Sequence, residues 1–290
     1  MIRRLFVVAG TLLVLSLSGT LFGQAVNDSL VFARALWNTR PLAEGVQWRQ
    51  YHFKGKEKLF GANQYVSLLV VDQGTGKYSF QVAIEPGKRQ RTSRAAEEAG
   101  ALAAINGSFY NTRPPYNSVC YLKINGEVIF ERSGKMGDRD GGAVLIDDRG
   151  RVSVEQGDPD DPQWVSTRTE PSIIGSGPMM LQDGQRIDMG TGAFVTLRHP
   201  RTAIGTSGNK VYLVTVDGRS KGNSLGVNLN ELANILKWLG AENALNLDGG
   251  GSTTMYIEGQ PENGIVNRPC DNQKFDRQGE RRVSNSLLLL

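Results

Sequence analysis

An acidic residue followed by three glycines is the part of the sequence best suited to chemistry. A short apolar run leads into Asp248, which is followed by Gly249, Gly250, Gly251 and Ser252. Three successive glycines cost conformational entropy, and they suit a turn whose backbone N–H groups approach an anion closely. An aspartate beside such a turn can act as a base, a nucleophile or a metal ligand. We therefore predict an anion-binding active site here, with a plain tight turn as the alternative.

Three further segments place polar groups at the ends of predicted strands. Asn106 follows one apolar run, Arg201 precedes another, and Asp217 and Arg219 follow a third. An arginine can hold a phosphate through two parallel hydrogen bonds. A second carboxyl group can complete an acid–base pair. The plainer alternatives are a surface salt bridge for Arg201 and a simple Asp-Gly turn at Asp217.

Strands dominate the elements that must position these residues. Residues 65–71 and 78–84 are predicted to form a hairpin. Asn125 and Gly126 predict a second hairpin around them, because an Asn-Gly pair accepts the positive φ of a two-residue turn. A third hairpin is predicted for 143–146 and 151–154, and a buried strand for 211–216.

Two helices are predicted between the strands. Asn228 and Glu231 form a capping box before a run of leucines on one face, and Gly240 ends this helix. A shorter helix covers about 93–99 and ends at Gly100. Strands interspersed with a few packed helices predict an α+β fold of mixed, mostly antiparallel strands in a single domain.

The two helices are each followed by the same short pattern. Residues 100–106 and 240–246 both read Gly-Ala-x-x-Ala-(Ile/Leu)-Asn. One interpretation is chance. The other is that two related half-units place Asn106 and Asp248 at similar strand ends.

The overall composition excludes several classes of protein. The chain has 290 residues, with 33 Lys+Arg against 29 Asp+Glu and a formal charge of +4. This composition is that of a globular protein rather than a disordered one. The basic residues form no stripe interleaved with aromatic residues, so nucleic acid is not an expected partner.

The first residues have the pattern of a secretory signal peptide. Arg3 and Arg4 precede the apolar run 5–17, and Ala25 ends a small-residue cleavage site. We predict a signal peptide over 1–25 and a catalytic domain over 26–290. The protein is then exported, periplasmic or secreted, with no stable membrane anchor after cleavage. A membrane anchor is the alternative.

Export affects the interpretation of the two cysteines. Cys120 and Cys270 are an even pair in a chain expected to meet an oxidising compartment, which predicts one long-range disulfide. Two separate buried thiols are the alternative.

Taken together, these segments resemble the phosphodiester glycosidase family over about residues 45–290. The matching segments follow the family's order: 106–110, 176–178, 201–205, 216–219, 246–252 and 283–286. The Asn-Leu-Asp-Gly-Gly-Gly-Ser run at 246–252 is the specific one. Ser108 stands where the family motif often has Gly or Asp, and Tyr110 stands where it has Phe.

The resemblance implies hydrolysis of a sugar-1-phosphodiester, similar to a GlcNAc-1-phosphodiester, at the sugar–oxygen bond. The implied catalytic residues are Asp248, its partner Asp217, and Asn106, which would orient the sugar or a water. Substrate and phosphate binding is assigned to Arg201, Thr202, Arg219, Gly249, Gly250, Gly251, Ser252 and Ser284. A phosphate leaving group already carries charge, so it needs less protonation than a sugar alcohol. The implied partner is a sugar phosphate or glycan, and the reaction requires no cofactor, although Ca²⁺ or Mg²⁺ is compatible with the site.

Two other functions remain open from the sequence. In a metal-dependent phosphodiesterase, Asp138, Asp217 and Asp248 would hold Mg²⁺ or Ca²⁺ through oxygen ligands. In a non-catalytic glycan-binding module, Tyr110, Tyr116 and the glycine loop would hold a sugar.

Overall fold

The computed structural model describes residues 27–131, 137–161 and 163–290. The predicted signal peptide, residues 1–25, lies outside the described residues. Within the described ranges, no helix combines the length and the apolar character needed to cross a membrane.

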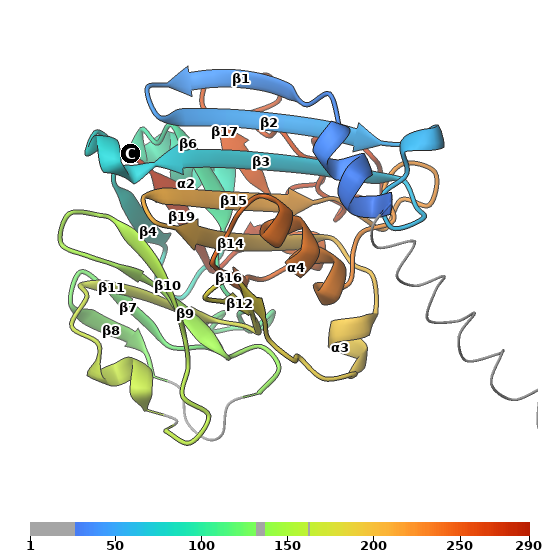
Figure 1. Ribbon diagram of the computed structural model, residues 1–290. Coiled ribbons are helices and arrows are strands. Elements are labelled where there is room, and N and C mark those ends of the chain that lie inside the picture. The colour runs from blue at the N-terminus through green and yellow to red at the C-terminus, as the bar shows by residue number, and fades with distance from the viewer. Residues whose placement is uncertain (1–26, 132–136, 162) are drawn as a thin grey trace, which may run out of the picture.

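An eight-stranded antiparallel sheet extends from β1, at the top of the molecule in Figure 1, down to β12 and β13. Its strands, in spatial order, are β1 (Asn38–Ala43), β2 (Val46–Phe53), β3 (Gln64–Asp72), β15 (Lys210–Val216), β14 (Arg201–Ser207), β16 (Asn243–Asn246), β12 (Met179–Gln182) and β13 (Gln185–Arg186).

Three smaller antiparallel sheets complete the strands. One contains β10 (Val152–Gln156), β9 (Gly142–Ile146), β11 (Ser172–Ser176), β7 (Leu122–Ile124) and β8 (Glu127–Phe130). Another contains β17 (Met255–Ile257), β6 (Ala103–Asn106), β19 (Asn285–Leu289) and β4 (Phe80–Ile84). The third pairs β18 (Arg282–Val283) with β5 (Gln90–Arg91).

Helices are few and short. The α-helices are α2 (Thr92–Ala99), α3 (Ala193–Thr196) and α4 (Leu229–Trp238), and residues 27–34 are also helical. Single turns of 3₁₀ helix are η1 (Gly55–Glu57), η2 (Gln73–Thr75), η3 (Trp164–Thr167) and η4 (Gly250–Ser252). The α+β class predicted from the sequence is confirmed.

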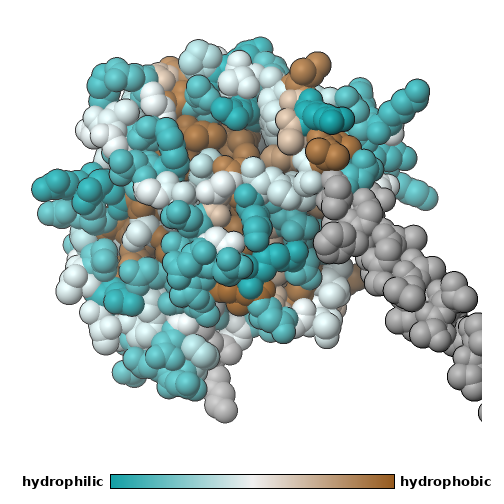
Figure 2. Space-filling model, in the orientation of Figure 1, coloured by the Kyte–Doolittle hydropathy of each residue, from teal (hydrophilic) through white to brown (hydrophobic). Residues whose placement is uncertain are grey.

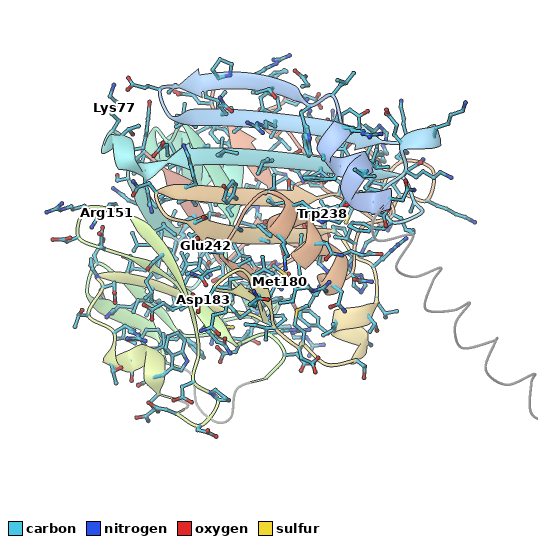
Figure 3. The ribbon with its side chains drawn as sticks, viewed as in Figure 1. Lys77, Arg151, Met180, Asp183, Trp238 and Glu242 are labelled. Atoms are coloured by element: carbon cyan, nitrogen blue, oxygen red, sulfur yellow. The ribbon has the colours of Figure 1, made fainter. Side chains whose placement is uncertain are left out.

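Side chains alternate between two cores on opposite faces of the large sheet. On β3, Leu69 and Val71 belong to the core shared with the smaller sheets, whereas Val66 and Leu68 belong to the core beneath α4. This is the period-2 alternation expected of a strand buried on both faces. Figure 3 shows Met180 on β12 and Trp238 on α4, which both contribute to the second core.

The outer surface over α4 is largely hydrophilic. In Figure 2, hydrophobic residues on this face form small separate areas between hydrophilic side chains. Such scattered apolar surface is normal for a globular protein and marks no interaction site by itself.

Most local predictions are confirmed. The capping box is complete, because Asn228 accepts from the Glu231 amide at 2.8 Å and Glu231 accepts from the Asn228 amide at 3.0 Å. Asn125 and Gly126 have φ of 51° and 86°, as the predicted two-residue turn requires. The hairpin of β9 and β10 and the buried strand β15 are also present.

The hairpin predicted for 65–71 and 78–84 is wrong. β3 pairs with β2 and β15 in the large sheet, while β4 pairs with β19 in a different sheet. Both segments are strands, but period-2 alternation states only that a strand has a buried face. It does not identify the neighbouring strand. Here the two segments pair with β15 and β19, which are distant in the sequence, although only a short connection through η2 separates β3 from β4.

Candidate functional site

The ends of three neighbouring inner strands of the large sheet, β15, β14 and β16, lie side by side. Arg201 begins β14 and lies opposite the last residue of β15, while Ala203 lies opposite Asn246, the last residue of β16. The residues that follow β15 and β16 therefore emerge beside Arg201. These include Asp217 and Asp248.

A cavity of about 270 Å³ lies at these strand ends. It is lined by Phe109, Tyr110, Thr112, Arg139, Phe194, His199, Arg201, Arg219, Asp248, Gly249, Gly250 and Arg281. Among these described lining residues, Asp248 is the one acidic side chain, and four are arginines. A single carboxyl group among four guanidinium groups suits an anionic ligand.

Asp248 is held firmly in this cavity. Its Oδ1 accepts from the Gly249 amide at 2.9 Å, and its own amide donates to the Gly107 carbonyl at 3.1 Å. Burial raises the pKa of Asp248 to about 6, against the opposing effects of the nearby Ser252 hydroxyl, the Gly249 amide and the arginines 281 and 139. A carboxyl group of this pKa is ionised at neutral pH and is a stronger base than an ordinary aspartate.

Asn106 lies behind Asp248 rather than in the cavity. It is fully buried, and its Nδ2 donates to the Asp248 carbonyl at 2.7 Å. Its Oδ1 accepts from the Thr202 hydroxyl at 2.8 Å and from the Thr254 amide at 3.0 Å. These bonds occupy the side chain and hold the Asp248 loop in place. Asn106 is the last residue of β6, and Asp248 comes two residues after the end of β16.

Asp217 also lies outside the cavity lining. It is 1% exposed, and its carboxyl oxygens accept from Asn267 Nδ2 and from the Arg268 amide, each at 2.8 Å. Burial raises the pKa of Asp217 to about 7. This placement favours a structural role, because the carboxyl group ties the 267–268 segment to the end of β15.

The raised pKa values predict that the protein becomes less stable as the pH rises from 6 to 8. Above the unfolded pKa of about 4, an aspartate that is still protonated in the folded state binds more protons there than in the unfolded state. Stability is then lost as the pH passes the folded pKa, which is about 7 for Asp217 and about 6 for Asp248. Burial lowers the pKa of His199, which acts in the opposite direction below pH 6.5.

We expect the free energy of unfolding to fall by about 1 kcal/mol between pH 6 and pH 8. Urea denaturation at the two pH values measures it. Asp217→Asn is expected to show a smaller fall, because the titrating carboxyl group is gone. A stability that rises over this range in the wild type would contradict the prediction.

Arg201 is a buried cation with no carboxylate partner among the described residues. Its guanidinium donates to the carbonyls of Val227 (3.2 Å), Phe194 (2.7 Å) and Leu197 (3.1 Å), and it lies 5.1 Å from the Phe194 ring centroid. Burial, and then the neighbouring Arg219, lower the pKa of Arg201 to about 10. A bound anion would offset both effects.

Two of the three glycines make room for arginine side chains, while a Cβ at Gly249 would lie 2.7 Å from the Pro200 carbonyl oxygen. A Cβ at Gly250 would lie 3.0 Å from Arg219 Nη2, and a Cβ at Gly251 would lie 2.4 Å from Arg281 Nη2. Gly250 also has a φ of +63°, which favours glycine.

Two of the three glycine amides in the predicted anion-binding turn are already bonded within the chain. The Gly249 amide is bonded to Asp248, and the Gly250 amide is bonded to the Pro200 carbonyl at 2.8 Å. Both donors are therefore already used within the chain. The anion-binding character of the cavity comes from guanidinium groups instead.

The remaining predicted binding residues are set back from the cavity. Thr202 and Ser252 are buried, and Thr202 is bonded to Asn106. Ser284 lies between β18 and β19 and is not among the lining residues. Arg219, by contrast, lines the cavity, and its Nη1 lies 3.9 Å from the sulfur of Cys270.

Several lining residues escape sequence reasoning. Arg139 lies 5.5 Å from the Phe109 ring centroid and 5.8 Å from that of Phe194, so these two rings form an aromatic wall with a cation over it. Arg281 donates from Nε to Asp271 at 3.0 Å. Neither arginine stands in a recognisable motif, since each belongs to an irregular loop. His199 has no predicted role, and Tyr110 is a predicted sugar contact only in the glycan-binding alternative.

The predicted disulfide between Cys120 and Cys270 is wrong, because no disulfide joins them. The Cys120 sulfur lies 3.2 Å from the Arg139 carbonyl oxygen, whereas the Cys270 sulfur lies beside Gly250 and Arg219. Each side chain is thus packed against a different part of the cavity wall.

The metal ligands suggested by the sequence are not brought together. Asp138 is exposed, and Asp217 lies behind the cavity. In the described part of the chain, no group of three or more His, Cys, Asp or Glu side chains is arranged to hold a metal ion.

Comparisons with known proteins match this chain to phosphodiester glycosidases. The sequence profile of the family described as phosphodiester glycosidase (NAGPA) matches residues 99–290. Mouse N-acetylglucosamine-1-phosphodiester alpha-N-acetylglucosaminidase is 28% identical over 187 residues, which are 59% of this chain and 35% of that protein. The SPbeta prophage-derived uncharacterized protein YomE of Bacillus subtilis is 27% identical over 203 residues, which are 67% of this chain and 31% of YomE. The chain thus spans about a third of each of these relatives.

The fold is shared with a solved structure. The zebrafish N-acetylglucosamine-1-phosphodiester alpha-N-acetylglucosaminidase catalytic domain, auto-inhibited by its pro-peptide, superposes with a TM-score of 0.62. The two are 22% identical, and the match covers 84% of this chain and 82% of that one.

Proposed function

The chain belongs to the phosphodiester glycosidase family, and we propose that it hydrolyses a sugar-1-phosphodiester at the bond between the anomeric carbon and the phosphate oxygen. The observation that carries this proposal is the composition of the cavity: one carboxyl group of raised pKa among four arginines. A glycosidase that releases a sugar alcohol commonly uses two carboxyl groups, one of which protonates the leaving oxygen. Here the leaving group is a phosphate monoester, which is a stabilised anion, so one carboxyl group and several cations suffice.

Each part of the cavity has a role in this reaction. The Asp248 carboxylate takes a proton from a water as the water oxygen bonds to the anomeric carbon. The bond from that carbon to the phosphate oxygen breaks, and the oxygen keeps the electron pair. Arg201 and Arg219 hold the phosphate and stabilise the charge that develops on it. The rings of Phe109 and Phe194 provide an apolar surface for the sugar.

The sugar we propose is N-acetylglucosamine, the one in the name of the mouse relative. We also propose that the protein is exported, since its first residues have the order of a charged segment, an apolar segment and a small-residue cleavage site. Its partner would then be a sugar phosphate or glycan outside the cytoplasm.

Hydrolysis of methyl-phospho-α-GlcNAc in ¹⁸O-labelled water tests the proposal. We expect the label in the free sugar and unlabelled methyl phosphate, because water attacks carbon. Mass spectrometry locates the label. Label in the phosphate would mean attack at phosphorus, as a phosphodiesterase performs it. Binding of the compound without turnover at any enzyme concentration would indicate a glycan-binding module. Either result would overturn the proposed reaction.

A further inference from the structure

Two arginines face each other across the smallest sheet. In the pairing of β18 with β5, Arg282 lies directly opposite Arg91. Like charges opposite one another on antiparallel strands are destabilising. Both side chains are exposed, and the ion pairs of the described residues include neither of them. A nearby anion would remove this repulsion.

The arginine pair lines a cavity that adjoins the candidate active site. This second cavity, of about 450 Å³, shares Tyr110, Thr112 and Arg281 with the first. Arg89 also lines it, with its guanidinium 4.4 Å from the Tyr116 ring centroid. A ligand bound in the first cavity can therefore continue into the second.

The acidic residues of the second cavity are already engaged. Asp271 is paired with Arg281. Glu280 accepts from the Ser93 amide at 2.8 Å and from the Ser93 hydroxyl at 2.6 Å. Glu280 also interacts electrostatically with Arg91. The lining still holds four arginines against two acidic residues, and the ion pairs of the described residues include none of Arg89, Arg91 and Arg282, so the cavity suits an anion.

We propose that Arg89, Arg91 and Arg282 bind a second phosphate, on the part of the substrate that follows the cleaved bond. This inference rests on the proposed function and narrows its substrate class. The preferred substrate is a glycan in which phosphodiesters repeat along the chain, rather than an isolated sugar-1-phosphodiester. The first phosphate lies against Arg201 and Arg219, and the next lies between Arg91 and Arg282.

Binding measurements test this independently of turnover. The probes are glycerol 1,3-bisphosphate, which carries two phosphates, and glycerol 3-phosphate, which carries one. We expect the wild type to bind the bisphosphate about 10-fold more tightly in calorimetry, from the added charge-assisted hydrogen bonds. Arg91→Gln/Arg282→Gln is expected to lose that preference. Arg34→Gln/Arg149→Gln is the matched control, because it removes the same charge from two exposed arginines that line neither cavity.

Stability and turnover complete the test. Since the Gln variant removes a repulsion, its Tm is expected to equal or exceed that of the wild type. For GlcNAc-1-phosphoglycerol, a second phosphate on the glycerol should raise kcat/KM about 10-fold in the wild type and much less in the variant. Three results would each overturn the second phosphate site. The Arg91→Gln/Arg282→Gln variant binds the bisphosphate as tightly as the wild type, the control variant loses the same binding preference, or the Arg91→Gln/Arg282→Gln variant has a lower Tm than the wild type. If the wild type prefers the bisphosphate, the Arg91→Gln/Arg282→Gln variant loses that preference, and no substrate is turned over, only the proposed reaction is overturned.

Discussion

Asp248→Asn is expected to lower kcat for a sugar-1-phosphodiester by about 10³-fold, the middle of the range for losing a general base. Asparagine has nearly the same shape and keeps an oxygen to accept from the Gly249 amide, so the loop retains its bond. What is lost is the ability to take a proton from water. Steady-state hydrolysis of methyl-phospho-α-GlcNAc, with circular dichroism to confirm folding, measures the effect.

The pH profile separates a chemical role for Asp248 from a structural one. Because burial raises the pKa of Asp248 to about 6, wild-type kcat should fall as the pH drops below that value. The asparagine variant should lack this fall in its residual activity. Asp183→Asn is the matched control, since Asp183 is exposed at the turn after β12 (Figure 3). A folded Asp248→Asn protein that keeps a tenth of the wild-type rate would exclude Asp248 as the base.

The position of Asp248, after a short strand and before a glycine turn, can be predicted from the sequence for a local reason. The strand, the acid and the glycines are consecutive, so their geometry depends on a few backbone angles that residue types restrict. The capping box of α4 and the Asn125–Gly126 turn are predictable for the same reason. The surroundings of the glycines are not predictable in this way, because the arginines that approach Gly250 and Gly251 are distant in the sequence.

The rest of the site depends on contacts between sheets. Asn106 ends β6 in the four-stranded sheet, yet it bonds to Asp248, two residues after the end of β16 in the eight-stranded sheet. Arg139 and Arg281 reach the cavity from loops whose positions are set by packing rather than by a local pattern. The surroundings of Asp217 are equally hard to predict. Its two hydrogen-bond donors, Asn267 and Arg268, are 50 and 51 residues away in the sequence. A single sequence carries no information about such pairings.

Arg201→Gln is expected to reduce kcat/KM for the phosphodiester by about 10²–10³-fold, the usual cost of removing one donor that stabilises developing charge. The reason is its position: a buried guanidinium beside Arg219, with a lowered pKa and no carboxylate among the described ion pairs. The reaction of 4-nitrophenyl α-GlcNAc, which lacks a phosphate, should be affected less than 10-fold. The ratio of the two substrates therefore reports phosphate binding.

Arg201 also has a structural role, which a second variant separates from the first. Its donors satisfy the carbonyls of Val227, Phe194 and Leu197, so Arg201→Gln is expected to lower Tm. Arg219 is exposed and makes no bond to a backbone carbonyl within the described chain, so Arg219→Gln should keep the wild-type Tm. If both guanidinium groups hold the phosphate, both variants shift the substrate ratio in the same direction, whatever their stability. Two results together would give these arginines a structural role only. The ratio of kcat/KM for the two substrates is unchanged in a stable Arg219→Gln protein, and Arg201→Gln loses the same factor of kcat/KM on both substrates.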